Sequence, residues 1–194
     1  ISPSYCFVPE PCYLVDYNLK RLLTLPNIIS IIRLVSALPI YFLIIEGLWE
    51  IAAAIFFISC LTDIADGAIA RKVNQATSFG ARLDHASDAI LASATILALG
   101  ANGVMPSILG ILVPIAFFQY FFDSGDPRDS NMLPSRLGKL NGIGYLLICG
   151  VSLFWLAADQ PALDKKTFLY LGYFLCVTTA LSMLERLYLV FIRE

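Results

Sequence analysis

Two closely spaced pairs of aspartates interrupt an otherwise apolar sequence. Asp63 and Asp66 are three residues apart, and Asp84 and Asp88 are four residues apart. Residues three or four apart share one face of a helix, so each pair would present its two carboxylates together. Four carboxylates at one place repel one another, and burying even one of them in lipid is costly. Either some of them are protonated, or cations lie between them.

Metal ions would relieve this repulsion. The four aspartates offer only oxygen ligands, which favours a hard metal such as Mg²⁺, with Mn²⁺ as the alternative. Two ions about 4 Å apart would suit two pairs of bridging carboxylates. The alternative is that the aspartates are ordinary helix-end residues paired with Arg71, Lys72 and Arg82. Four carboxylates on facing helices at matched depth favour the metal site.

Small and basic residues beside the first pair predict a ligand that carries phosphate. Gly67 and Ala70 lie on the same helical face as Asp63 and Asp66, and they leave a hollow where a bulky ligand can approach the backbone. Arg71 follows at the membrane boundary and is well placed to hold a phosphate. Together with the metals, these residues indicate a site for a nucleoside diphosphate.

The elements that position these residues are long and apolar. The 194 residues are 58% hydrophobic and only 14% charged, with a mean hydropathy of +0.76, whereas soluble domains carry about 25% charged residues. A bilayer core about 30 Å thick needs roughly 20 apolar helical residues, and lipid favours helices because they satisfy their own backbone hydrogen bonds. The sequence predicts an all-α integral membrane bundle of six transmembrane helices: 28–46, 48–70, 80–102, 106–122, 140–158 and 167–191.

The predicted helices place the two aspartate pairs at one depth. Asp66 lies roughly 6 Å inside the end of its helix, and Asp84 lies roughly 6 Å inside the start of the next. Flanks on this side carry nine basic residues, whereas the opposite loops carry only Lys165 and Lys166, which predicts a cytoplasmic active site and cytoplasmic termini. Residues 1–27 would be a cytoplasmic or interfacial segment before a membrane domain at 28–194. The nine residues are Lys20, Arg21, Arg71, Lys72, Arg82, Arg128, Arg136, Lys139 and Arg193.

The spacing of these residues resembles the signature of the CDP-alcohol phosphotransferase family. The signature reads D-x2-D-G-x2-A-R-x8-G-x3-D-x3-D. Eight fixed residues match by chance about once in 10¹⁰ starting positions, and the six-helix layout extends the resemblance to most of the chain. The sequence meets every fixed position, with Asp63, Asp66, Gly67, Ala70, Arg71, Gly80, Asp84 and Asp88.

The resemblance implies phospholipid synthesis at the membrane face. A CDP-linked lipid, usually CDP-diacylglycerol, is attacked at its β-phosphorus by the hydroxyl of an acceptor alcohol, and CMP leaves. The resemblance implies that the four aspartates would ligate the metals and that Asp88 would also serve as the base. The residues that would bind the CDP part, or let the helices approach it, are Gly67, Ala70, Arg71 and Gly80.

The acceptor alcohol is less clearly indicated. The stretch 66–84 most resembles the phosphatidylglycerolphosphate synthase branch, which makes glycerol 3-phosphate the predicted acceptor. Inositol phosphate, inositol, serine and a phospholipid are the alternatives. That branch usually has proline after the third aspartate and lysine after the fourth, where this sequence has His85 and Ala89. Because His85 points about 100° away from Asp84 on the helix, we expect it to have a packing or interface role.

Basic residues near the same face are candidates for binding an acceptor phosphate. Arg136 and Lys139 lie three residues apart at the start of the fifth predicted helix, although they would equally anchor that helix. Arg186 is a further candidate, or a snorkelling arginine beside Glu185. In the first helix, Arg33 could reach the nucleotide or the lipid headgroup.

Two further expectations concern the first helix and assembly. Asn27 stands where a residue that caps the first helix is expected. Gly138 and Gly142 form a GxxxG pattern that permits close helix packing inside the bundle or in a homodimer, and the resemblance also suggests a dimer.

The rival function from another class is a small cation transporter that uses the aspartates as its ion site. Transport sites usually lie near the bilayer centre on interrupted helices, whereas these aspartates lie near one face beside Arg71. The sequence therefore predicts a membrane-embedded transferase. Its expected partners are CDP-diacylglycerol, an acceptor alcohol and membrane lipids, with no nucleic acid.

Overall fold

The computed structural model describes residues 25–73, 78–123, 136–158 and 164–193. Near several helix ends it describes the backbone without the side chains, most importantly over 63–73 and 78–79. The predicted interfacial segment at 1–27 therefore lies almost wholly outside the described residues.

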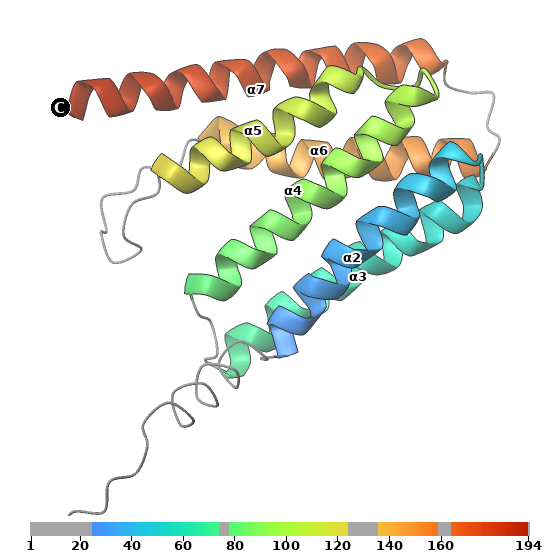
Figure 1. The fold of residues 1–194 in the computed structure, drawn as a ribbon, viewed down its shortest axis with the longest axis horizontal. Coiled ribbons are helices and arrows are strands. Elements are labelled where there is room, and N and C mark those ends of the chain that lie inside the picture. The colour runs from blue at the N-terminus through green and yellow to red at the C-terminus, as the bar shows by residue number, and fades with distance from the viewer. Residues whose placement is uncertain (1–24, 74–77, 124–135, 159–163, 194) are drawn as a thin grey trace, which may run out of the picture.

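The described part of the chain consists of six α-helices, with no strand (Figure 1). Each predicted helix is found, and each of its ends lies within four residues of the predicted one. The prediction of an all-α six-helix bundle is therefore confirmed. The helices are α2 (Leu25–Ile45), α3 (Trp49–Val73), α4 (Ser78–Ala101), α5 (Ser107–Asp123), α6 (Arg136–Ala157) and α7 (Lys165–Arg193).

Three of these helices contain segments long and apolar enough to cross a bilayer, within the residues described. They are Asn27–Ile45 in α2, Leu137–Ala157 in α6 and Lys165–Leu189 in α7. Shorter apolar segments occur at Trp49–Thr62 and Ser107–Phe121. Length and composition thus agree with a helical membrane bundle.

Helix α4 lies at the centre of the bundle. It packs against α2 on one side and α5 on the other, and it also contacts α6 (Figure 1). Leu91, Ile96 and Leu99 of α4 are fully buried, and Ile90 is the one large apolar side chain of α4 that is exposed among those described. The outer helices instead expose many large apolar side chains, as a lipid-facing surface requires. This position keeps the aspartates of α4 partly buried between helices.

Two glycine turns close the helical hairpins at the end of the bundle away from Asp84. Gly47 and Gly103 have φ angles of 75° and 69°, a left-handed conformation that glycine adopts without steric cost. In each turn the next residue returns a backbone hydrogen bond to the preceding helix, from Leu48 to Leu43 at 2.8 Å and from Val104 to Leu99 at 3.0 Å. These tight turns make α2–α3 and α4–α5 antiparallel pairs.

One expectation about the first helix is wrong. Asn27 does not precede the helix as a cap, because α2 already begins at Leu25. Asn27 is instead buried within the first turn, with 2% of its surface exposed.

Candidate active site

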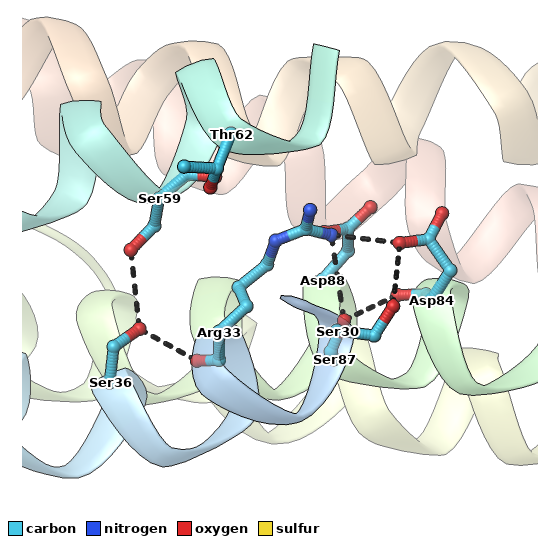
Figure 2. Close-up of polar contacts among 8 residues, drawn as sticks. All are labelled: Ser30, Arg33, Ser36, Ser59, Thr62, Asp84, Ser87 and Asp88. Carbon is cyan, nitrogen blue, oxygen red and sulfur yellow. Dashed lines mark hydrogen bonds and ion pairs between the residues drawn. The ribbon is translucent and has the colours of Figure 1, made fainter. Parts of the chain in front are cut away.

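An arginine from α2 joins two aspartates of α4 in a compact ion-pair cluster (Figure 2). Nη1 of Arg33 donates to Oδ1 of Asp88 at 2.6 Å and to Oδ1 of Asp84 at 3.0 Å. The Arg33 side chain is only 2% exposed, whereas the side chain of Asp84 is 38% exposed and that of Asp88 is 27% exposed. A buried guanidinium requires such charged partners, because an unpaired charge inside a bundle is strongly destabilising.

Helical periodicity explains why these three side chains meet. Asp84 and Asp88 are one turn apart and share a face of α4. Arg33 lies on the same buried face of α2 as Ala37 and Ile40, the face that packs on α4. The ion pairs therefore lie where the two most closely packed helices meet.

Serine hydroxyls complete the polar contacts around this cluster. Ser30 of α2 donates to Oδ1 of Asp84 at 3.4 Å. Ser87 of α4 accepts from Nη1 of Arg33 at 3.5 Å and donates to the backbone carbonyl of Asp84 at 2.8 Å. These hydroxyls supply partners to groups that would otherwise be poorly satisfied inside the bundle.

The polar contacts continue from α2 to α3. Ser36 donates to the carbonyl of Arg33 at 2.7 Å, and its hydroxyl lies 3.2 Å from that of Ser59. On α3, Thr62 donates to the carbonyl of Ser59 at 2.8 Å (Figure 2). The residue after Thr62 is Asp63, so this chain of contacts reaches the helix that carries the first aspartate pair.

The aspartates of α4 fit a divalent cation. One ligating atom from each of Asp84, His85 and Asp88 lies within 4.8 Å of the others. Carboxylate oxygens suit Mg²⁺ and Mn²⁺, and imidazole suits transition metals. The spacing of the side chains is therefore compatible with a metal site on α4.

His85 lies closer to this group than its helical position suggested. Its exposed side chain contacts Tyr120 edge-on, with the ring centroids 6.4 Å apart, in agreement with the expected packing role. The ring nevertheless brings a nitrogen into the group with Asp84 and Asp88. The angle of 100° between neighbouring residues applies to Cβ directions, and the longer imidazole bends back toward the carboxylates.

An apolar cavity of about 420 Å³ opens beside Arg33 and Asp88. It lies between α3, α4 and α6, and its lining is almost wholly hydrocarbon. The apolar side chains in this lining include Phe56, Phe57, Leu91, Leu146, Leu147 and Phe154. A cavity lined by two charged side chains and otherwise by hydrocarbon matches a lipid that has a polar head and an acyl chain.

A second arginine lies on the other side of α4. The guanidinium of Arg186, from α7, lies over the ring of Tyr120, 4.7 Å from its centroid. Gly138 of α6 makes room for it, because a Cβ built there would come within 2.9 Å of Nη2 of Arg186. Tyr120 thus touches both Arg186 and His85, which links this arginine to the group formed by Asp84, His85 and Asp88.

Comparison with known proteins identifies the class of fold and site. The sequence pattern of the CDP-alcohol phosphatidyltransferases matches residues 23–184. The chain belongs to this family. The resemblance carried by the aspartate motif is therefore confirmed, and the apolar helices and the family together indicate a membrane protein.

Several curated relatives of this CDP-alcohol phosphatidyltransferase family member are cardiolipin synthases. The probable cardiolipin synthase (CMP-forming) of Drosophila melanogaster is 27% identical over 190 residues, which cover 86% of this chain and 57% of the relative. The cardiolipin synthase (CMP-forming) of Homo sapiens is 29% identical over 175 residues, which cover 80% of this chain and 56% of the relative. The chain thus spans little more than half the length of these relatives.

A solved structure shares the fold. The apo crystal structure of phosphatidylinositol phosphate synthase (PgsA1) from Mycobacterium tuberculosis has a TM-score of 0.58 and is 23% identical. The alignment covers 92% of this chain and 95% of that one. The arrangement of helices is therefore that of a known member of the family.

The structure describes only part of the predicted site. Asp84 and Asp88 meet, and Gly80 is half-buried in the first turn of α4. The other family positions lie in the last turns of α3, where the side chains are outside the described residues, so their roles stay predictions. These positions are Asp63, Asp66, Gly67, Ala70 and Arg71.

The predicted acceptor-binding residues are also only partly described. Arg136 begins α6, but its side chain lies outside the described part. Lys139 is exposed on the first turn of α6 and makes no ion pair with any side chain that the structure describes. Arg186 is the basic residue of this group that the structure holds inside the bundle. The contact of Arg33 with both aspartates was not foreseen, and its position on an apolar helical face was the only signal of a buried role.

Proposed function

We propose that this chain transfers a phosphatidyl group from CDP-diacylglycerol to the hydroxyl of an acceptor alcohol and releases CMP. One observation carries the proposal: Asp88, which shares a face of α4 with Asp84, lines an apolar cavity within the residues matched by the family. A soluble nucleotide would not need a hydrocarbon-lined cavity. A transported ion would not need one either. A lipid linked to a diphosphate accounts for both features.

Each group would have a defined role in this reaction. The acceptor oxygen forms a bond to the β-phosphorus, the bond from that phosphorus to the CMP oxygen breaks, and CMP leaves with the bonding electrons. Asp88 would take the proton of the acceptor hydroxyl. Asp63, Asp66, Asp84 and Asp88 would hold two divalent ions, Mg²⁺ or Mn²⁺, which neutralise the diphosphate when bound.

The CDP part would lie against the end of α3. Gly67 and Ala70 would let the nucleotide approach the helix backbone, and Arg71 would bind a phosphate. Gly80 would let the start of α4 come close to the same ligand. The excess of basic residues at this end of the bundle supports a cytoplasmic site, with the acyl chains reaching into the bilayer.

Phosphatidylglycerol is the acceptor that the relatives favour. Relatives in two animals are cardiolipin synthases that form CMP, and cardiolipin carries two phosphatidyl groups on one glycerol, so an acceptor that already holds one is required. Glycerol 3-phosphate, the acceptor predicted from the sequence, is the second candidate. The guanidinium of Arg186 over Tyr120 favours an anionic acceptor of either kind, because it offers its donors to a phosphate.

A CMP-release assay tests the proposal. The purified protein in detergent is given CDP-diacylglycerol and Mg²⁺, with phosphatidylglycerol, glycerol 3-phosphate or inositol phosphate as the acceptor, and EDTA in a parallel control. We expect acceptor-dependent CMP release that EDTA abolishes, fastest with phosphatidylglycerol. Release that is equally fast without any acceptor would indicate a hydrolase instead. No release with any of the acceptors would refute the proposed transfer.

A further inference from the structure

We infer that Arg33 makes the site selective for small divalent cations, by holding one oxygen of each of Asp84 and Asp88. The inference rests on the proposed metal-dependent function and concerns which ion this part of the site accepts. It gives a role to a buried arginine that lies outside the family signature.

The contacts of Arg33 define which carboxylate atoms are engaged. Nη1 of Arg33 binds Oδ1 of Asp88 at 2.6 Å and Oδ1 of Asp84 at 3.0 Å. Ser30 adds a second contact to the same oxygen of Asp84 at 3.4 Å. An ion that takes both oxygens of either carboxylate must therefore displace Arg33 or bind an oxygen that already accepts from this positively charged group, which repels the ion.

Displacing Arg33 is unfavourable. Its side chain is 2% exposed, and α2 packs on α4 through the face that carries Arg33. Releasing the guanidinium from the two aspartates would break two ion pairs of a buried charge, which is costly. The engaged oxygens therefore remain engaged when a cation binds.

Engagement of one oxygen per carboxylate discriminates between cations. Ca²⁺ takes about 6–8 oxygen ligands and often uses both oxygens of a carboxylate. Mg²⁺ takes an octahedral set of about six ligands, keeps several waters and is usually bound through one or two carboxylates. Restricting both aspartates to one-oxygen binding therefore disfavours Ca²⁺ more than Mg²⁺ or Mn²⁺.

A purely structural ion pair would have a different signature. If Arg33 served only to hold α2 against α4, its loss would lower folding stability and change the affinities for Ca²⁺ and Mg²⁺ together. The ratio of the two affinities therefore separates a role in selectivity from a role in folding alone. The loss of one positive charge also cancels in this ratio, because both ions carry the same charge.

Competition for bound Mn²⁺ measures this ratio directly. Wild type, Arg33→Gln, Arg33→Lys and the control Ser36→Ala are purified in detergent, and bound Mn²⁺ is followed by electron paramagnetic resonance during titration with Ca²⁺ or Mg²⁺. Ser36 is the matched control because it lies one turn deeper on α2 and touches no carboxylate. Removing the outer contacts of metal ligands typically changes metal affinity about 10–100-fold.

We expect Arg33→Gln to shift the ratio toward Ca²⁺ by at least about tenfold, while Ser36→Ala keeps the wild-type ratio. Arg33→Lys should shift it by a smaller factor, because an ammonium keeps the positive charge and can still donate to a carboxylate, although with a different geometry from the guanidinium. A ratio within about twofold of wild type in both Arg33 variants would overturn the inference, as would a wild-type protein that binds no Mn²⁺. If Arg33→Gln does not purify as a folded protein, Arg33→Lys carries the test with the same criterion.

The competition uses neither CDP-diacylglycerol nor an acceptor, so it is independent of the CMP assay. A shifted ratio without CMP release from wild type would refute the proposed transfer and leave the role of Arg33 intact. CMP release from wild type, together with an unchanged ratio of Ca²⁺ to Mg²⁺ affinity in the Arg33 variants, would support the proposed transfer and overturn the role of Arg33.

Discussion

The two arginines beside the centre of the bundle have opposite surroundings. Arg33 is almost fully buried, and its guanidinium is bound to the carboxylates of Asp84 and Asp88. Arg186 is half-buried and lies over the ring of Tyr120. No carboxylate in the described part of the chain lies within ion-pair distance of Arg186.

This difference indicates separate roles for the two arginines: Arg33 would position the aspartates, whereas Arg186 would bind a ligand. The charge of Arg33 is matched within the protein, so Arg33 orients the aspartates. The charge of Arg186 is balanced by no described carboxylate, and an aromatic face holds its plane while leaving its edge donors to another group. We therefore expect changes on the α2 side of α4 to affect the chemical step, and changes on the α7 side to affect acceptor binding.

The largest effect is expected from Asp88→Asn, on the Arg33 side. The amide keeps the shape of the side chain but cannot take the proton of the acceptor, so kcat for CMP release should fall by about 10²–10⁴-fold. Bound Mn²⁺ should persist, because other carboxylates remain. Full activity of this variant in the CMP assay would rule out Asp88 as the base.

A smaller effect is expected from Arg186→Gln, on the opposite side. Loss of a hydrogen bond to a charged group costs about 1.5–3 kcal/mol, so KM for an anionic acceptor should rise about 10–100-fold. KM for CDP-diacylglycerol should stay unchanged, and Arg186→Lys should recover part of the loss. The control is Lys166→Gln, which removes an exposed charge at the other end of α7.

The KM of Arg186→Gln for a neutral acceptor would show whether Arg186 binds the phosphate of the acceptor. If Arg186→Gln raised KM for glycerol as much as for glycerol 3-phosphate, Arg186 would not be a phosphate ligand. An equal rise in KM for CDP-diacylglycerol would instead place Arg186 with the donor.

A more modest effect is expected from filling the cavity beside Arg33. Gly150 of α6 lines this cavity, and a Cβ there would lie 3.4 Å from the ring of Phe56. Gly150→Leu should raise KM for long-chain CDP-diacylglycerol about tenfold, because about two methylenes of space, worth about 0.8 kcal/mol each, are lost. A short-chain donor should be affected less.

Gly142→Leu is the matched control for the cavity. Gly142 lies on the same helix, but a Cβ there would meet open space. An equal loss with long-chain and short-chain donors in Gly150→Leu would contradict an acyl chain in the cavity.

The smallest effect is expected from Tyr145→Phe, which tests the packing that supports the Arg186 side. The hydroxyls of Tyr145 on α6 and Thr179 on α7 are 2.6 Å apart and buried. Polar contacts between membrane helices contribute about 0.6 kcal/mol on average, so Tm in detergent should fall by about 1–3 °C. Tyr170→Phe, at an exposed position of α7, should leave Tm unchanged. A higher acceptor KM with an unchanged Tm would mean that Tyr145 binds substrate rather than stabilising the bundle.

The sequence was sufficient to predict the helices and the family. A bilayer tolerates only backbone that satisfies its own hydrogen bonds, so apolar runs of about 20 residues specify helices before any packing is considered. The same regularity placed Asp84 and Asp88 on one face of α4 and near one end of the bundle, where the structure has them. The spacing of eight residues was then enough to identify the family.

Side-chain partners that lie far apart in the sequence were decided by the tertiary structure. Arg33 is 51 residues from Asp84 and 55 from Asp88, and no local rule relates them. Their contact depends on how α2 is rotated and how closely it packs on α4. The placement of Arg186 over Tyr120 depends in the same way on α7 meeting α5, and on the missing side chain at Gly138 of α6.

The sequence by itself therefore determined that Asp84 and Asp88 share one face near one end of a helix in a six-helix membrane bundle, because helical periodicity and lipid thickness act along each helix independently. Only the packing of the helices decided that one arginine is bound to those carboxylates and that the other rests on an aromatic ring. These contacts run between helices, and the relative rotation of two helices follows from all the side chains at their interface rather than from any single motif.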